Sequence, residues 1–189
     1  MTLRELVTKN RTIRRFRGAT RISAVRLRRL VDLARLSPSA ANRQPLKYIL
    51  VNTPGRNKLV FPCLAWAGYL KGWPGPAEGE RPSAYIVVLG DTAIADSFDC
   101  DAGIAVQSIM LGAVEAGLGG CIVGSIERDG LRKALVIPRR YQILLVLALG
   151  EPAEKVEIET TSGSDIRYWR DDRGVHHVPK RRLCDVVLS

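Results

Sequence analysis

The chain has 189 residues, of which 46% are hydrophobic and 25% are charged, a composition typical of one globular domain with a sizeable core. It shows no apolar N-terminal leader, no apolar run long enough to span a bilayer, and four scattered cysteines without a Cys-x-x-Cys pair. The sequence therefore argues against a secreted or membrane protein, a disulfide framework and a metal site, and we expect a cytoplasmic protein with reduced thiols.

The net charge of +10 is unevenly distributed, since residues 1–35 hold ten arginines and Lys9 against Glu5 and Asp32. A second basic cluster follows at 180–182. Such asymmetry indicates an anionic partner: nucleic acid, a membrane surface or a phosphate-bearing cofactor. The alternative interpretation is that the basic residues form a surface that contacts only solvent.

Two helices are predicted near the N-terminus. Residues 2–9 have Thr2 as a candidate N-cap and Glu5 three positions later, the pattern of a capping box. Residues 23–36 place apolar side chains every three to four positions and arginines on the other faces, as in an amphipathic helix. Between these helices, Arg11 and Arg14 would point to one side if the stretch is turn-like.

The loop at 37–45 is polar and contains two prolines, each of which disfavours helical backbone at the preceding residue. Its serine, asparagine and glutamine side chains can bond a heteroaromatic edge or a phosphate. It lies before a predicted strand at 48–52, so it is either a ligand-binding loop or a plain helix-to-strand connection whose polar groups satisfy their own backbone.

Residues 56–71 are weakly helical in pattern, whereas 72–82 are too rich in proline and glycine for a regular element. We therefore expect 61–82 to be a candidate lid. Its aromatic residues Trp66, Tyr69 and Trp73 either pack this segment onto the domain or shape a pocket.

The second half of the chain contains most of the apolar elements. The stretch 101–118 is apolar nearly all round, which indicates a helix buried in the core or against a partner subunit. The other predicted elements are strands at 84–90, 121–123 and 143–150, a helix at 127–135, a hairpin-like turn at 170–174, a short basic element from 178, and an edge strand at 184–188.

Side chains for hydrolytic or metal chemistry are scarce. The only histidines, His176 and His177, are in the polar tail, and no G-x-S-x-G, G-x-G-x-x-G, Walker or metal-ligand spacing is present. The features that remain are many arginine and lysine side chains, a polar loop and glycine-rich backbone. These are suited to holding a phosphorylated cofactor whose own ring performs the chemistry.

Six stretches resemble the FMN-dependent nitroreductase family and follow one another in the family's order. Arg-Thr-Ile-Arg-Arg-Phe at 11–16 is similar to its Arg-Ser-x-Arg/Lys-x-Phe signature, and 37–45 is similar to its Ser-Pro-Ser-x-x-Asn-x-Gln-Pro signature. The other four stretches are 101–118, 117–121, 147–152 and 178–183. The chain departs from the family at Asn10, where many members have Arg, and at Leu46 and Gly124.

The resemblance implies an α+β fold, with a central, mostly antiparallel β-sheet flanked by helices, in a single domain spanning 1–189. It also implies an intertwined homodimer with FMN at the interface, and 178–189 as a phosphate-binding run with an edge strand. The implied FMN contacts are Arg11, Thr12 and Arg14; Lys180 and Arg182 at the phosphate; Pro38, Ser39 and Asn42 from the other subunit; and the backbone of Gly124 and Ser125 near the flavin N5.

The activity implied by this resemblance is a ping-pong transfer of hydride from NADH or NADPH through FMN to a nitroaromatic, quinone or similar small-molecule acceptor. No side chain needs to act as an acid or base, so no catalytic residue is assigned. The resemblance implies neither a nucleic-acid nor a membrane partner. Two alternatives stay open: a basic nucleic-acid-binding domain, and a flavoprotein of this fold with specialised chemistry such as dehalogenation or flavin fragmentation.

Overall fold

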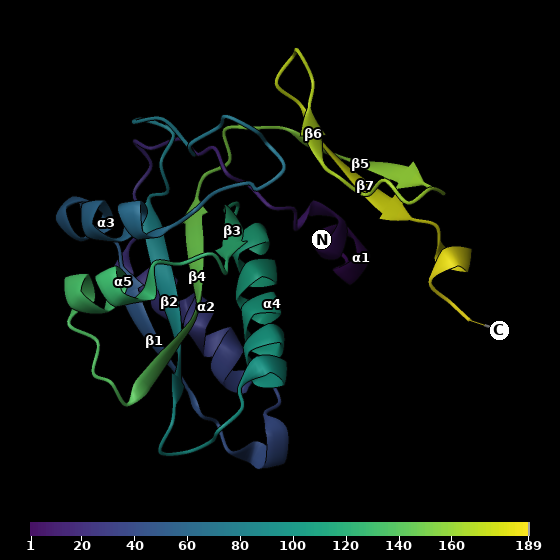
Figure 1. Cartoon of the computed structure of the whole chain (residues 1–189). Helices are drawn as coiled ribbons and strands as arrows, with labels where there is room; N and C mark the ends of the chain where they lie inside the picture. The colour runs from purple at the N-terminus through teal and green to yellow at the C-terminus, as the bar shows by residue number, and fades with distance from the viewer. Residues whose placement is uncertain (189) are drawn as a thin grey trace.

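The computed structural model describes residues 1–188 and has a four-stranded antiparallel sheet at its centre (Figure 1). The strand order is β1-β2-β4-β3. The strands are β1 (Leu46–Val51), β2 (Ala84–Asp91), β3 (Gly119–Val123) and β4 (Tyr141–Gly150). Every residue of β2 is buried, which suits its inner position in the sheet. The expected α+β fold with a central antiparallel sheet is confirmed.

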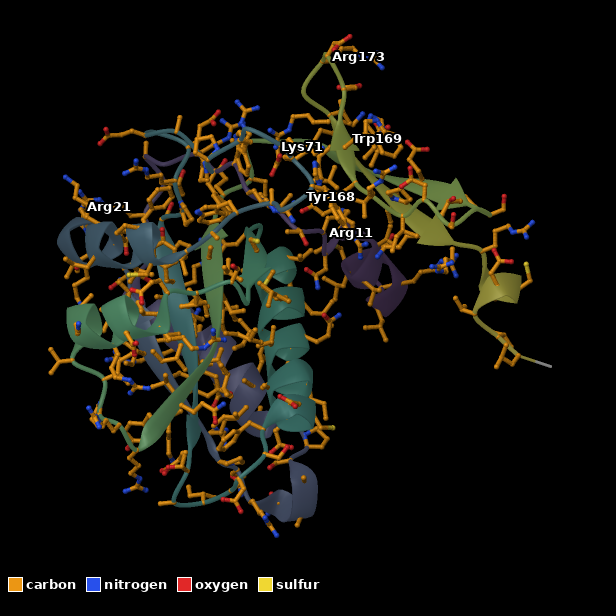
Figure 2. The ribbon with its side chains drawn as sticks, viewed as in Figure 1. Arg11, Arg21, Lys71, Tyr168, Trp169 and Arg173 are labelled. Carbon is orange, nitrogen blue, oxygen red and sulfur yellow. The ribbon has the colours of Figure 1, made fainter. Side chains whose placement is uncertain are left out.

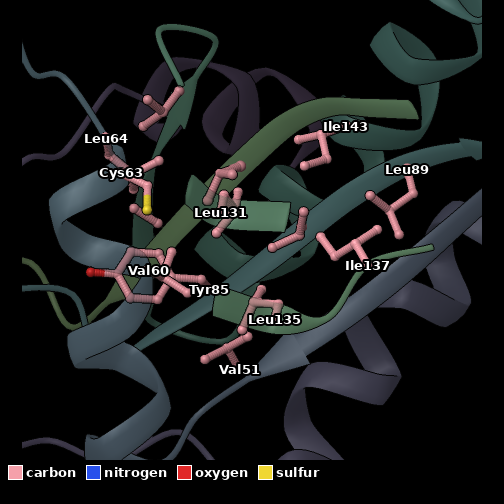
Figure 3. Packing of buried hydrophobic residues seen from close by; sticks show 14 of the residues in the cluster. Val51, Val60, Cys63, Leu64, Tyr85, Leu89, Leu131, Leu135, Ile137 and Ile143 are labelled. Atoms are coloured by element: carbon pink, nitrogen blue, oxygen red, sulfur yellow. The ribbon is translucent and has the colours of Figure 1, made fainter. Parts of the chain in front are cut away.

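Helices cover both faces of this sheet and divide the core in two. On one face lie α2 (Ala24–Leu36) and α4 (Asp99–Glu115), with Leu27, Leu30 and Ile109 buried against β2 and β4. On the other face lie α3 (Pro54–Val60) and α5 (Arg128–Leu135), whose Val60, Leu131 and Leu135 pack around Tyr85 (Figure 3).

The predicted helix starts agree with the structure. The helix α1 (Leu3–Lys9) begins with a complete capping box between Thr2 and Glu5, and Ser23 caps α2 by accepting from the backbone N–H of Arg26. The weak helical pattern at 56–71 was wrong for most of its length: α3 is followed only by a 3₁₀ turn, η2 (Phe61–Cys63), and the chain beyond it is irregular.

A second, three-stranded sheet forms from the C-terminal part of the chain and extends away from the central body (Figure 1). Its strands are β5 (Val156–Thr161), β6 (Trp169–Arg170) and β7 (His176–Arg181). The strand β7 pairs with β5 in parallel and with β6 across the predicted turn, in which Gly174 has a positive φ of 78°. This sheet was not predicted from the sequence; only its turn and a short basic element from 178, which is part of β7, were expected.

The edge strand predicted at 184–188 is wrong. The chain instead forms a 3₁₀ turn, η3 (Leu183–Asp185), in which the N–H of Asp185 donates to the Arg182 carbonyl and the two side chains form an ion pair at 3.0 Å. A strand needs a neighbour to satisfy its backbone, and this segment instead satisfies its groups locally. Ser189 lies outside the described residues. No helix in the described chain has the length and apolarity needed to cross a membrane.

Candidate functional site

The N-terminal segment that carries Arg11, Thr12 and Arg14 lies beside β3. Thr12 bridges to Gly120, and the N–H of Ile13 donates to the Gly120 carbonyl at 2.9 Å. This backbone is extended rather than turn-like, as its bridge shows. Ile13 anchors the segment, and any side chain at Gly119 would lie 2.7 Å from it.

Four of the predicted FMN contacts line one hollow, which we call the cationic cavity, of about 270 Å³. It lies between the N-terminal segment, α4, β3 and the C-terminal sheet. Its walls are formed by Asn10, Arg11, Thr12, Arg14, Gln107, Met110, Gly120, Ile122, Tyr168, His176, Val178 and Lys180.

The cationic side chains of this cavity form no ion pairs within the described residues. Within residues 1–188, neither Arg11, Arg14 nor Lys180 forms an ion pair, and the Nε atoms of both arginines are buried without a hydrogen-bond partner. Burial lowers the pKa of Arg11 from its usual value, because removing water disfavours its charged form. An anionic group that accepts hydrogen bonds would give the buried Nε atoms a partner and would stabilise the desolvated charge of Arg11. The residues present therefore fit a bound phosphate.

Arg14 is fixed from the C-terminal half of the chain. Glu154, whose side chain is 2% exposed, accepts hydrogen bonds from the backbone N–H groups of Arg14 and Arg15, the latter at 3.0 Å. Its other oxygen pairs with Arg170 on β6 at 2.8 Å. This carboxylate therefore ties the N-terminal segment to the C-terminal sheet.

A second hollow, the Trp66 cavity, adjoins the first and shares Arg14 and Ile122 with it. It measures about 260 Å³, and the predicted residues Gly124 and Ser125 are in its wall together with Trp66. Gly124 is exposed, and a Cβ added there would meet nothing closer than 3.8 Å, so the packing of this chain does not require a glycine at that position. Open backbone is thus available beside the cationic cavity.

The only thiol in these walls is unreactive. Cys121 lines the Trp66 cavity, and burial raises the pKa of its thiol to about 11. The thiol therefore stays protonated at neutral pH and is a poor nucleophile.

The candidate lid at 61–82 is anchored at several points. Arg15 binds Glu80 through two nitrogens, with its Nε at 2.9 Å, and the ring of Trp66 packs against Gly75. Tyr69 is exposed, and its ring lies 5.0 Å from that of Tyr168. Trp66 belongs to the core and also lines a cavity. This one residue therefore both packs the segment onto the domain and shapes a pocket.

The loop at 37–45 lies elsewhere on the same chain. Pro38 and Ser39 line a separate hollow of about 200 Å³, and Asn42 is in the wall of neither site cavity. The Ser39 hydroxyl donates to Asp101 at 2.6 Å and accepts from the backbone N–H of Gln44 at 2.9 Å. That hydroxyl therefore serves the loop itself, and contacts of this loop with a cofactor stay a prediction.

The predicted site residues thus separate into three groups. Arg11, Thr12, Arg14 and Lys180 come together, Gly124 and Ser125 lie next to them, and Pro38, Ser39 and Asn42 are apart within one chain. Arg182 is not in the cavity wall and pairs with Asp185. Three polar wall residues were not predicted, Gln107, Tyr168 and His176, and Asn10, noted only as a departure from the family, is also in the wall.

Comparison with known proteins agrees with this architecture. The profile of the Nitroreductase family matches residues 7–71 and 78–151. An Archaeoglobus fulgidus protein named NADH dehydrogenase/NAD(P)H nitroreductase is 26% identical over 177 residues, covering 89% of this chain and 91% of the relative.

Solved structures share the fold. A nitroreductase family protein from Clostridium difficile 630 has a TM-score of 0.66 at 24% identity, covering 82% of this chain and 86% of its own. An FMN-dependent nitroreductase from Clostridium difficile R20291 also has a TM-score of 0.66, at 22% identity, covering 79% and 87% respectively. Because the family profile spans well over half of the sequence, the chain belongs to the nitroreductase family.

Proposed function

We propose that this protein is an FMN-dependent oxidoreductase that uses NADH or NADPH to reduce a nitroaromatic, quinone or similar conjugated acceptor. The observation that carries the proposal is the cationic cavity, where Arg11, Arg14 and Lys180 converge without carboxylate partners in the described chain. The Trp66 cavity, which shares Arg14 and Ile122 with it and is lined by the exposed Gly124, is where the ring and a reactant would lie.

Each wall residue has a role that its chemistry suits. Arg11 and Lys180 would bind the phosphate, with Thr12 at the ribityl chain. Arg14, shared by both cavities, would donate to the pyrimidine edge and stabilise negative charge there. Ile122 is 44% exposed on β3, so its apolar side chain is free to pack against the ring.

The chemistry requires little from the protein's own acids and bases. FMN, when bound, would accept a hydride from the nicotinamide and pass the electrons on to the acceptor, in a ping-pong sequence. The protein would hold the reactants, exclude water and stabilise charge. Two titratable wall groups near Arg14 suit that passive role, because burial raises the pKa of Cys121 to about 11 and lowers that of His176 to about 4, which leaves each uncharged at neutral pH.

The proposal includes a homodimer. The helix α4 exposes Gly103, Ile104 and Gln107 along one stripe, and Ile104 is 37% exposed. At a rise of about 1.5 Å per residue, Asp101, which holds the 37–45 loop, lies roughly 10 Å along the helix from Gln107 in the cationic cavity. A partner packed on this stripe would bring its own Pro38, Ser39 and Asn42 to the cofactor.

The decisive measurement is the visible absorption spectrum of purified protein, before and after incubation with FMN and desalting. We expect flavin bands to stay with the protein, and the bound flavin to be bleached by NADH or NADPH without oxygen and recovered on adding a quinone. Protein that stays colourless with FMN would overturn the proposal, and steeply salt-dependent DNA binding would then favour the nucleic-acid alternative. Bound flavin that neither nicotinamide reduces would instead favour the specialised flavin chemistries.

A further inference from the structure

The guanidinium group of Arg14 is held by two side chains of the C-terminal region. Nη1 of Arg14 donates to Nε2 of His176 at 3.3 Å, and its central carbon lies 4.7 Å from the centre of the Tyr168 ring. The rings of Tyr168 and His176 lie 5.2 Å apart, so the two side chains also support one another. Figure 2 shows Tyr168 near Arg11, where the C-terminal sheet meets the body of the molecule.

The bond from Arg14 requires a neutral imidazole. His176 is 1% exposed, and burial together with the charge of Arg14 lowers its pKa to about 4. Arg170 and His177 act in the same direction, and Glu154 opposes them. Because the guanidinium of Arg14 can only donate, Nε2 is the acceptor of this bond; the ring proton then belongs on Nδ1, which is buried without a hydrogen-bond partner in the described chain.

Both supporting residues lie beyond position 151, where the match to the family profile ends. We propose that Tyr168 and His176 are positioning residues that orient the Arg14 guanidinium in the cationic cavity toward the polar edge of the cofactor ring. This inference rests on the proposed function for the identity of that cofactor. The contact with Arg14 is itself a property of the chain alone.

The first test compares two changes at one position. His176→Leu removes the acceptor at similar bulk, whereas His176→Gln keeps an oxygen that can accept from Arg14. We expect His176→Leu to weaken FMN binding about tenfold by fluorescence titration, and His176→Gln to restore most of it. His177→Gln is the matched control, since its side chain contacts Glu159 and Asp171 instead.

The midpoint potential of bound FMN separates orientation from mere packing. If Arg14 stabilises the reduced, anionic ring, its displacement weakens binding of reduced FMN more than that of oxidised FMN. A tenfold difference corresponds to a potential about 30 mV more negative for a two-electron couple. We expect this shift for His176→Leu and Tyr168→Leu, and little shift for Tyr168→Phe, which keeps the ring over Arg14.

A double-mutant cycle in FMN-free protein distinguishes this inference from the proposed function. His176→Leu should lower the melting temperature by about 2–4 °C in the wild type and by clearly less when Arg14→Met is already present. If the protein never binds FMN but still shows this coupling, the proposed function is overturned and the Arg14 contact is supported. Additive shifts, or equal FMN affinity and potential in His176→Leu and His176→Gln, would overturn the inference itself.

Discussion

A buried histidine beside an arginine makes stability depend on pH. The folded-state pKa of His176, about 4, lies below its ordinary value of 6.5, so the unfolded chain takes up this proton first as the pH falls. The contribution of neutral His176 to the stability of the folded state is complete above about pH 6.5 and is lost progressively toward pH 4. We expect this residue alone to remove on the order of 2 kcal/mol from the free energy of unfolding across that interval.

Urea unfolding at several pH values between 7.5 and 4, for wild type and His176→Gln, measures this contribution as a difference. Other titrating groups are common to both proteins, including His177, whose pKa is raised by Glu159 and whose effect has the opposite sign. The wild type should lose more stability than the variant as the pH falls. Parallel curves would show that His176 is already charged or solvated in the native state.

Single residues also show where sequence reasoning stops. That Arg11, Arg14 and Lys180 line one cavity was predictable, because the stretches that carry them resemble the family's signatures; their contact with a phosphate stays a prediction. The position of His176 was not predictable, since a histidine in a polar tail carries no signal of its burial. Ala41 and Gln44 both have φ of 50°, a backbone conformation that residues other than glycine rarely adopt, and local sequence did not indicate it.

Among the elements, β7 shows why the C-terminal basic run is only partly a site. Alternate residues of a strand face opposite sides, and His176, Val178 and Lys180 all line the cationic cavity. Arg181 belongs to the other face, and Arg182 lies past the end of the strand. One of the three consecutive cations therefore lines the cavity of its own chain.

This alternation can be tested with two substitutions that change the net charge equally. Lys180→Met should weaken FMN binding about tenfold, because a charge-assisted hydrogen bond to phosphate is lost. Arg181→Met should leave the affinity within about twofold, since its only effect would be screened long-range attraction. Fluorescence titration at fixed ionic strength measures both. Equal losses would mean that net charge, rather than the geometry of β7, holds the phosphate.

The elements differ in how far the sequence revealed them. The strands β2 and β4 are long apolar runs, and α1 and α2 carry capping signals, so their existence and type were predictable. The strand β5 was not predicted, although Val156 and Ile158 alternate with glutamates, which is a strand pattern. The 184–188 stretch was predicted from apolar residues alone, and a strand also depends on a pairing partner that local sequence cannot show.

For the whole molecule, the proposed dimer predicts that each FMN site combines two chains. One protomer carries Arg11→Met and Arg14→Met, and the other carries Asn42→Gly. Glycine is chosen because Asn42 has a φ of 54°, where alanine would add backbone strain. A heterodimer of these chains has one site with both defects and one with none.

We expect this heterodimer, isolated with two different affinity tags, to retain about one FMN, against about two for the wild-type dimer. Each homodimer of a variant should retain little at the same concentration. Absorbance after desalting gives the stoichiometry, and sedimentation gives the assembly state. If the loop and the arginines act within one chain, both protomers are defective and the heterodimer retains as little as its parents.

The origin of the cavity walls at both ends of the chain has a consequence for biosynthesis. Arg11 and Arg14 are translated before the central sheet and Lys180 after it, because that sheet is complete once Gly150 has been made. At about 5–20 residues per second, the positions from 151 to 180 follow within a few seconds. The central sheet can therefore fold before β7 is made, but the proposed phosphate site cannot form until Lys180 has been translated, so retained FMN would report a chain that reaches at least Lys180.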